Sequence, residues 1–466
     1  MAARSLQTQM TGIEVSGQNL ANVNTTGYSR QVVHIATSPD VTTSIGQEGT
    51  GADATSIQQI VSSLLNSQIQ SQGSTSGYWN AQQAGLQSAQ NGLNEFLNGS
   101  GATSSTSSTT AATTDSGLGG QLSGLFNAFQ TVATSSTSVS ARQALIGQAQ
   151  TVAASFNNIN TQLGSLKTSL NSSLQTDVSS ANTLLTQIAG LNSQISTAEF
   201  SGGNANDLRD EREQDLENLS QLTNITTSTG TNGAVNVTLG GQTLVAGNTV
   251  SDTLQTYDPG NGSLLVQTKT GGVNLTLTGG SMQGTIDARD GTLATLQSSL
   301  NTLANTLITQ VNNVHAGGYN LTGGTGNNFF NGTNAGTITV NQALVDNPSL
   351  VQASGSATAS GDNSVALQLA QLAATTQAGL NNQTFNDSYD ATVANLGTAL
   401  QNANTQVTNQ TTVTNMLATQ RGSISGVNVD EEMTNLMTFQ RAYQASAQVV
   451  TTVNTMLGTL LAMTPN

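Results

Sequence analysis

Cysteine is absent from the 466-residue chain. This absence excludes disulfide bonds, thiol nucleophiles and zinc sites with cysteine ligands. Charged residues are also scarce, at 8% of the sequence, whereas an average soluble domain has about 25%. The polarity of the chain comes instead from Ser, Thr, Asn, Gln and Gly, whose side chains form hydrogen bonds without the desolvation cost of a charge. The length allows two to four domains, and the composition favours wide contacts between subunits.

Basic residues are especially few. Ten Lys and Arg residues against 25 Asp and Glu residues give a formal net charge of −15. Binding to nucleic acid needs clustered Lys and Arg, so we expect no nucleic acid partner and no anionic membrane surface as partner. Apolar runs of about 18 residues are missing, and we expect no membrane insertion. The first residues also lack the apolar core of a signal peptide, so export would not use the general secretory route.

Signatures of catalysis are missing as well. The two histidines, His34 and His315, lie far apart and have no flanking ligand pattern, so changing either to Ala is expected to have little effect. Residues 207–217 hold the densest cluster of charge, with acidic side chains around Arg209 and Arg212. On a helix this pattern is usually a solvated face with weak ion pairs, such as Arg209 with Glu213, and a function there would be subunit contact. We expect no enzyme activity, no catalytic residue, no cofactor and no metal.

Heptad patterns occupy both ends of the chain. The N-terminal pattern comprises Leu6, Met10, Ile13, Gly17 and Leu20. The C-terminal pattern comprises Val429, Met433, Leu436, Gln440, Tyr443, Ala447, Val450, Asn454, Leu457 and Leu461. A repeat of 3.5 residues requires a partner helix, because a lone helix leaves its apolar stripe in water. The two stripes can bury each other, or they can bury matching helices on neighbouring copies. Polar residues within the stripes make the isolated helices marginal, so we expect both termini to fold on assembly.

The pattern between the termini predicts a rod and a β domain. Helices are expected at 1–22, 55–97, 118–134, over about 60 residues ending near 200, and at 207–222, 282–315, 364–378, 385–424 and 430–462. An extended segment at 28–35 followed by a loop to about Thr50, a low-complexity linker at 99–116, and short strands at 225–277 and within 317–362 complete the prediction.

The predicted fold class is α+β and multidomain. A long helical rod and coiled coil are built from both termini, and a central, mostly-β domain loops out. The expected domains are an inner terminal coiled coil at 1–50 and 425–466, a helical rod at 51–224, 281–316 and 363–424, and an outer β domain at 225–280 and 317–362.

Two segments resemble the axial proteins of the bacterial flagellum. The segment 19–31, NLANVNTTGYSRQ, is similar to the stretch that follows the N-terminal helix in rod, hook and hook-associated proteins. The segment 425–448, SGVNVDEEMTNLMTFQRAYQASAQ, narrows the resemblance to the FlgK family of hook-associated proteins. Shorter matches at 141–147, 207–212 and 317–330 agree. Members of this family usually begin somewhat earlier, which leaves open whether Met1 is the true start, a misplaced start or a trimmed terminus.

The resemblance implies a mechanical role. Both terminal helices would pack in the inner core of a tubular assembly, adapting the hook to the filament, with the β domain facing outward. It also implies a homo-oligomeric ring or helical layer, with the hook protein and the second junction protein as neighbours. Export by the flagellar type III apparatus, an export chaperone at the C-terminal helix and an extracellular location follow in the same way. The implied assembly interface consists of Leu6, Met10, Ile13, Leu20, Asn22, Asn24, Gly27, Tyr28, Arg30, Val429, Met433, Leu436, Phe439, Tyr443, Val450, Leu457 and Leu461.

Two other classes stay open. The chain could be another flagellar axial protein, of the flagellin or hook type. It could also be a cell-surface adhesin, because the strand-rich middle is dominated by Ser, Thr, Asn and Gly.

Overall fold

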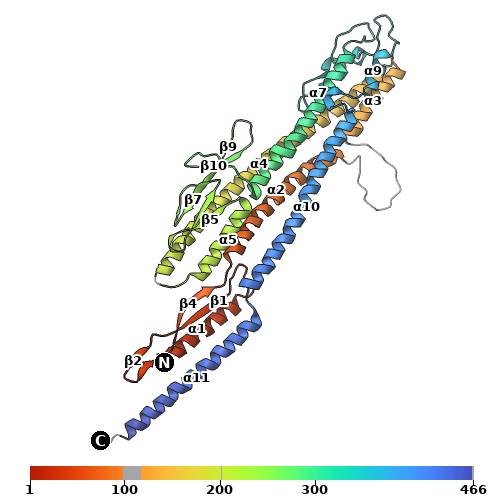
Figure 1. The fold of residues 1–466 in the computed structure, drawn as a ribbon. Coiled ribbons are helices and arrows are strands. Elements are labelled where there is room, and N and C mark those ends of the chain that lie inside the picture. The colour runs from red at the N-terminus through yellow and green to blue at the C-terminus, as the bar shows by residue number, and fades with distance from the viewer. Residues whose placement is uncertain (98–116, 201, 464–466) are drawn as a thin grey trace, which may run out of the picture.

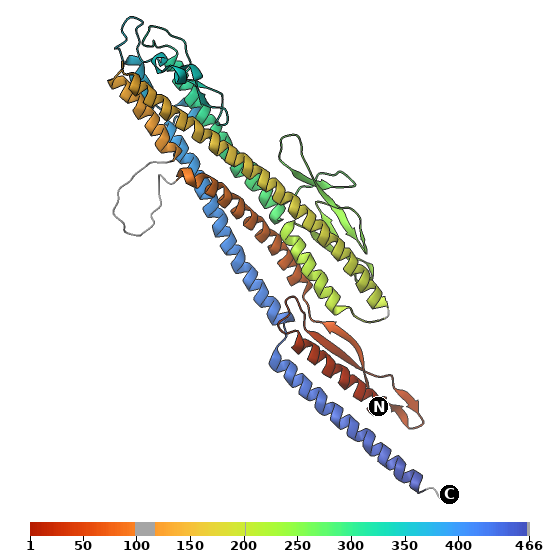
Figure 2. The same cartoon turned by 180° about the vertical axis from the view of Figure 1, so that it is seen from behind.

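Long helices with apolar stripes dominate the computed structural model, which describes residues 1–97, 117–200 and 202–463. They run side by side along a rod, and both chain ends lie at the same end of it (Figures 1 and 2). The helices are α1 (Ala2–Ala21), α2 (Ser63–Leu97), α3 (Leu118–Thr134), α4 (Val139–Phe200), α5 (Asn206–Leu222), α6 (Gly280–Asp287), α7 (Ala294–His315), α8 (Gln342–Asp346), α9 (Ser364–Gln371), α10 (Phe385–Ser425) and α11 (Val429–Ala462).

The strands form small antiparallel sheets. They are β1 (Gln31–Thr37), β2 (Val41–Thr43), β3 (Gly46–Glu48), β4 (Ala52–Gln59), β5 (Thr226–Thr229), β6 (Val235–Leu239), β7 (Gln242–Ala246), β8 (Thr249–Val250), β9 (Leu254–Tyr257), β10 (Leu265–Thr268), β11 (Phe330–Asn331) and β12 (Thr339–Val340). One sheet has four strands in the order β5-β6-β7-β8, and the others are two-stranded.

Helix α4 is the backbone of the rod. It has 62 residues and, at 1.5 Å per residue, extends about 90 Å. Its buried residues recur at helical spacing along the whole length, so a continuous apolar stripe faces the neighbouring elements. The first half of α4 shares one apolar core with α3, α7, α9 and α10, and the second half shares another with α5, α6 and the sheets of β5 to β10. The predicted rod with a strand-rich layer on its side is therefore confirmed.

The glycine-rich segment 317–362 does not complete the β domain, and that prediction is wrong. Phe329, Phe330 and Val351 are buried in the distal core with α3, α4 and α7, whereas the strands of 225–280 bury the other core. The physical reason is the aromatic pair: Phe329 packs against Phe129, with ring centroids 5.2 Å apart, at the far end of the rod. We call this end, formed by α3, α9, 317–362 and the adjoining ends of α4 and α7, the distal head.

Two buried basic side chains, the charged Arg142 and the neutral His315, fasten the loops of the distal head. Arg142 is fully buried and donates to the carbonyls of Ser136 (2.6 Å) and Val351. Burial lowers the pKa of Arg142 to about 10. His315 is also fully buried, with Nδ1 2.8 Å from the Asn327 carbonyl and Nε2 accepting from the Gln352 N–H at 2.9 Å. These contacts overturn the expectation that changing His315 has little effect.

The segment 51–62 is also different from the prediction. The helix expected to begin near Thr55 begins at Ser63, and Thr55 lies in β4, which pairs antiparallel with β1. The expected loop before it contains the hairpin of β2 and β3. We call the β1–β4 pair the ribbon, and the β2–β3 hairpin, residues 41–48, the arm.

Candidate assembly surface

Helix α1 lies between the ribbon and helix α11. On the ribbon side, the Thr8 hydroxyl donates to the Ala52 carbonyl at 2.9 Å. The buried Asn19 side chain donates to the Gln31 carbonyl at 2.8 Å and accepts from the Gln31 N–H at 2.9 Å. The Tyr28 hydroxyl donates to Asn19 at 2.9 Å. These bonds fix the turn after α1 and hold the helix on the ribbon.

Small residues on α1 allow its close contact with α11. A Cβ added to Gly12 would come within 2.7 Å of the Phe439 ring, so only glycine fits here. Two turns away on each helix, the hydroxyls of Ser5 and Ser446 lie 2.9 Å apart. Because the close approach falls on these small residues, the predicted apolar stripe of α1 is not the face that meets α11.

The two apolar stripes therefore do not bury each other. Met10 is 53% exposed on α1, and Met433 (45%), Leu457 (54%) and Leu461 (72%) are exposed on α11. Leu6, Ile13, Leu20, Leu436, Phe439 and Val450 are half-buried. All residues from 451 to 463 are exposed, so the last three turns of α11 have no cover within the described chain. An uncovered apolar stripe of this kind marks a surface for another helix.

We call α1, the ribbon and α11 together the terminal unit. A group of polar contacts, which we call the elbow, joins this terminal unit to the rod. The Arg30 N–H donates to the Ser425 carbonyl at 2.8 Å, and its guanidinium pairs with Glu431 (2.9 Å) and Glu432 (2.8 Å). Asn428 caps α11 by accepting from the Asp430 N–H at 3.0 Å. The acidic residues at 430–432 lie in the first turn of α11, where they favour the positive end of the helix dipole, and two of them also bind Arg30.

The charged helix α5 forms the other half of the elbow. Asp210 accepts from the Ser29 N–H at 2.8 Å, and Asp207 accepts from the Gln31 amide at 2.7 Å. Glu217 is buried and pairs with Arg421 of α10. Burial raises the pKa values of the Asp210 and Glu217 carboxyls above their ordinary range. The cluster therefore connects the terminal unit, α5 and α10.

The prediction of a solvated face on α5 with an ion pair between Arg209 and Glu213 is therefore wrong. Arg209 pairs with Glu199 of α4 at 2.7 Å, while Glu213 accepts from Gln70 of α2 at 2.9 Å. Arg212 is 7% exposed and donates to Asn192 at 2.9 Å. The i, i+4 spacing on one helix gave no signal for partners on neighbouring helices.

No metal or membrane site emerges from the described ranges. Within residues 1–97, 117–200 and 202–463, no three His, Asp or Glu side chains group closely enough to hold a metal ion. In the same ranges, no helix combines the length and apolar character that crossing a bilayer requires.

The predicted interface residues fall into two groups. Asn22, Asn24, Gly27, Tyr28 and Arg30 lie at the turn and elbow after α1, where Gly27 adopts a positive φ of 84°. The others lie on α1 and α11. Sequence reasoning missed Asn19, Gly12 and the ribbon. A glycine and serines at one helical face were the available signal for the close contact.

The geometry defines a class of protein: an elongated helical subunit, with both termini at one end and apolar helix faces left open there for other subunits. Comparisons with known protein families narrow this class further. The model of the FlgK helical domain of flagellar hook-associated proteins matches residues 103–330, and the C-terminal model of flagellar basal-body rod FlgEFG proteins matches residues 423–463.

Relatives match over nearly the whole chain. Flagellar hook-associated protein 1 of Bacillus subtilis is 28% identical over 97% of this chain and 94% of its own length. The protein of the same name from Salmonella typhimurium is 25% identical over 99% and 98%. The flagellar hook junction protein FlgK from Burkholderia pseudomallei has a similar fold, with a TM-score of 0.63 at 19% identity, covering 77% of this chain and 100% of that one. The chain belongs to the FlgK family of flagellar hook-associated proteins.

Proposed function

We propose that this chain is a structural subunit of the bacterial flagellum at the hook–filament junction, which self-assembles through its terminal helices and adapts the hook to the filament. The observation that carries the proposal is the open apolar stripe on α11, at the end of the rod where both termini meet. Its relatives are flagellar hook-associated proteins, which supports the location.

Burial of the stripes supplies the driving force. Fully burying one Val, Leu or Met side chain contributes about 1.5–3 kcal/mol. The exposed apolar residues of α11 recur along its length: Val429, Met433, Met437, Tyr443, Val449, Val453, Met456, Leu457, Leu460 and Leu461. They lie on more than one face of the helix, so α11 can contact more than one neighbour. The tight contact of α1 at Gly12 keeps both helices aligned for those neighbours.

The proposed interface keeps the residues predicted from the sequence, on α1, at the turn after it and on α11. The terminal unit, with α1, the ribbon and α11, forms the inner part of the assembly. The helical rod forms the middle, and the strands between 225 and 280 form the outer part. The segment 317–362 belongs with the distal head of the rod.

The partners follow from this arrangement. Copies of the chain form a ring or helical layer, with the hook protein and the second junction protein as axial neighbours. A flagellar export chaperone binds α11 before export through the type III apparatus, and the exposure of 451–463 supports that access. The protein then acts outside the cell, as a structural element without enzymatic activity.

Complementation tests the proposal. The chain is expressed in a motile bacterium from which its own junction protein has been deleted, and the hooks are imaged. Filaments on the hooks are the expected result. Bare hooks, with the chain secreted into the medium in normal amounts, would show that it is exported without assembling and would count against the junction role.

A further inference from the structure

Exposed apolar side chains continue from the terminal unit onto the rod. On α11, Val429 and Met433 lie one turn apart and are exposed. Across the elbow, Ile424 and Met416 lie two turns apart near the end of α10, and Met416 is 61% exposed. Leu64, at the start of α2, is 69% exposed. We call these five residues the ridge.

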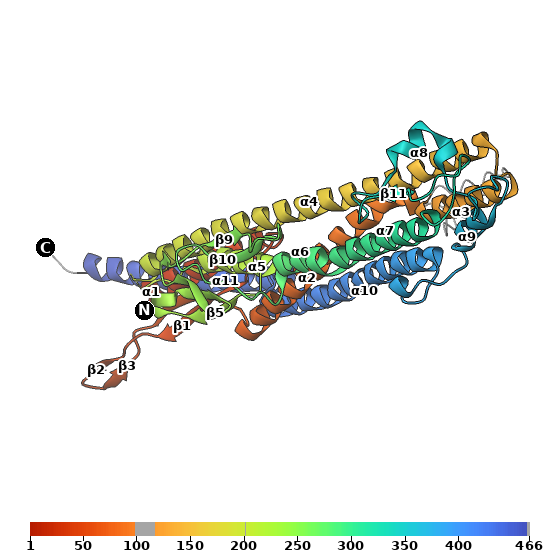
Figure 3. The ribbon, with the colours of Figure 1, turned by 90° about the horizontal axis from the view of Figure 1, so that it is seen from above.

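The rod part of the ridge combines two helices. Figures 1 and 3 show α2 and α10 side by side along the rod, with α4 on the side away from α10. Two hydrogen bonds between side chains set their register, from Gln72 to Gln410 and, at 2.7 Å, from Gln83 to Asn404. Residue numbers rise along α2 as they fall along α10, so the helices are antiparallel. This register places Leu64 level with the stretch of α10 between Met416 and Ile424.

Leu64 and Met416 lie on the same face of the α2–α10 pair. On the opposite face, Ile69 of α2 and Leu417 of α10 line a small cavity together with Glu217 of α5. Each residue of a helix is turned by about 100° from the one before it. Leu64 and Met416 are therefore directed away from α5, onto a face that no other described helix covers.

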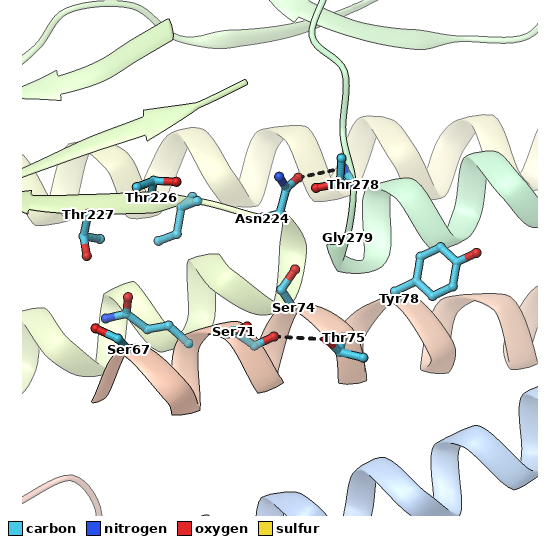
Figure 4. Close-up of a pocket in the computed structure, with 12 residues that line it drawn as sticks. Ser67, Ser71, Ser74, Thr75, Tyr78, Asn224, Thr226, Thr227, Thr278 and Gly279 are labelled. Carbon is cyan, nitrogen blue, oxygen red and sulfur yellow. Dashed lines mark hydrogen bonds between the residues drawn. The ribbon is translucent and has the colours of Figure 1, made fainter. Parts of the chain in front are cut away.

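A neighbouring surface on α2 has a different character. Figure 4 shows Ser67, Ser71 and Thr75 beside a groove that Thr226 and Thr227 close on the other side. Most of the lining of this groove consists of hydroxyl and amide groups. Burying such groups exchanges hydrogen bonds with water for hydrogen bonds with protein, whereas burying the ridge removes apolar area from water. The ridge therefore has the stronger driving force for docking.

Charge favours a second copy as the occupant of the ridge. The chain has a net charge of −15, so two copies repel each other wherever their carboxylates meet. Helix α10 has no charged residue between Asp390 and Arg421, and α2 has none before Glu95. Arg421 is paired with Glu217 within the chain. Two copies can therefore approach at the rod part of the ridge without this repulsion, whereas a cationic partner would gain nothing there.

We propose that one neighbouring copy covers the apolar stripe of α11 and the rod part of the ridge together. Its contact crosses the elbow and fixes the angle between the terminal unit and the rod. Only the turn at 426–428 separates Ile424 from Val429 along the chain side of the elbow. A helix with its side chains is about 10–12 Å wide, so a neighbour that packs on Val429 also reaches Ile424. The inference rests on the proposed self-assembly and extends its interface onto the rod.

Added charge on the rod part of the ridge tests the contact. The chain with Leu64→Glu and Met416→Glu is expressed together with the unmodified chain in the deletion host. Its share in isolated hook–filament junctions is compared with its share in the medium, which corrects for export. Incorporation should fall about tenfold or more, because each substitution places an unpaired charge in a contact that excludes water. Both positions are exposed, so chemical denaturation of the purified monomer should be unchanged.

The matched control adds the same two charges beside the ridge. Ser67→Glu and Asn415→Glu lie at exposed polar positions on the same helices and should incorporate normally. Normal incorporation of the ridge variant would overturn the inference, and so would an equal loss in the control. In both cases the unmodified chain still builds filaments. Failure of the unmodified chain to build them would instead count against the proposed function.

Cross-linking identifies the occupant, since the chain has no cysteine of its own. Met416→Cys on the rod and Met433→Cys on α11 are each labelled with a thiol-directed photo-cross-linker in isolated junctions. Both should yield a dimer of this chain, whereas Ser67→Cys should yield none. A cross-link from Met416→Cys to the hook protein, the second junction protein or an export chaperone would overturn the assignment of a second copy. A dimer from Met433→Cys alone would show that the contact stops at the elbow.

Discussion

The distal head and the terminal unit differ in how far they bury their apolar side chains within one chain. In the head, apolar side chains such as Phe329 and Leu145 are fully buried, and even Arg142 and His315 find hydrogen-bond partners inside the chain. In the terminal unit, Met433 and Leu457 remain in water, and no described residue of α1, the ribbon or α11 belongs to either large core. The head buries its apolar side chains within one copy, whereas the terminal unit leaves apolar side chains exposed, and we propose that neighbouring subunits cover them.

The largest effect is expected from a double substitution on α11, which should affect the terminal unit and leave the rod unchanged. Leu436→Asp together with Leu457→Asp should abolish incorporation into flagella, because each places an unpaired charge where an apolar stripe must be buried. The rod should stay folded, as measured by circular dichroism of the purified variant. Thr438→Asp, at an exposed polar position on the same helix, serves as control and should assemble normally. Normal filaments built from the double variant would refute the assembly model.

A truncation in the head should cost stability, and the same change in α11 should not. Phe329→Ala removes a fully buried ring that contacts Phe129, His315 and Phe330, and should destabilise the folded rod by about 3–5 kcal/mol. Val453→Ala, where the side chain is 47% exposed, should change the stability of the monomer by less than about 0.5 kcal/mol. Chemical denaturation of both variants measures the difference. Equal losses would remove the contrast between the two regions.

The elbow between the regions should depend on one of two adjacent carboxylates. Glu432→Ala leaves Arg30 without its buried partner and should weaken the attachment of α11 by about 2–3 kcal/mol. Glu431 contacts the same arginine, but its side chain is 56% exposed, so Glu431→Ala should cost less than about 1 kcal/mol. Protease cleavage rates at 425–429 report the effect. Similar rates for both variants would show that burial of the pair does not matter.

Lowering the pH should change the folding stability of the distal head and of the elbow in opposite directions. Burial lowers the pKa of His315 from 6.5 to about 4, so the unfolded chain binds a proton more readily than the folded head. This group favours unfolding progressively as pH falls from 6.5 to 4, by up to about 3 kcal/mol. At the elbow, burial raises the pKa values of Asp210 and Glu217 above their ordinary 3.8 and 4.5, so the folded state gains relative stability as pH falls toward those values.

Variants separate the two contributions to the pH dependence. Denaturation of His315→Gln between pH 7 and pH 4 should show a weaker loss of stability toward acid than the unmodified chain. His34→Ala, at an exposed position, should follow the unmodified chain. If His315→Gln and the unmodified chain lost stability in parallel, the buried imidazole would not be the source.

The sequence predicted the helical rod well because its helices are long and strongly periodic, as in α4. It failed at 51–62 because Ile57, Ile60, Val61 and Leu64 also fit helical spacing, while the pairing of β4 with β1 depends on a register set by distant residues. It misplaced 317–362 because short glycine-rich strands do not reveal which core they join. The docking of Phe329 on Phe129 decides that, across 200 residues of chain.

The sequence located the candidate assembly surface on α1 and α11, but it did not show which face of α1 contacts α11. Heptads located the apolar stripes on α1 and α11, and those residues are the exposed or half-buried ones. The face that joins α1 to α11 depends instead on Gly12 and Ser5, whose small size allows close approach and leaves no hydrophobic pattern. Likewise, the charged helix α5 was visible, but its partners on α2, α4 and α10 were not, because spacing along one helix carries no information on neighbouring helices.

Amide hydrogen exchange before and after assembly tests the central claim most directly. In the purified monomer, residues 451–463 should exchange rapidly while the distal head around Phe329 stays protected. In isolated hook–filament junctions, 451–463 should become protected as neighbouring copies cover the stripe. Protection of 451–463 in the monomer, or no gain on assembly, would contradict the view that other subunits complete this end of the protein.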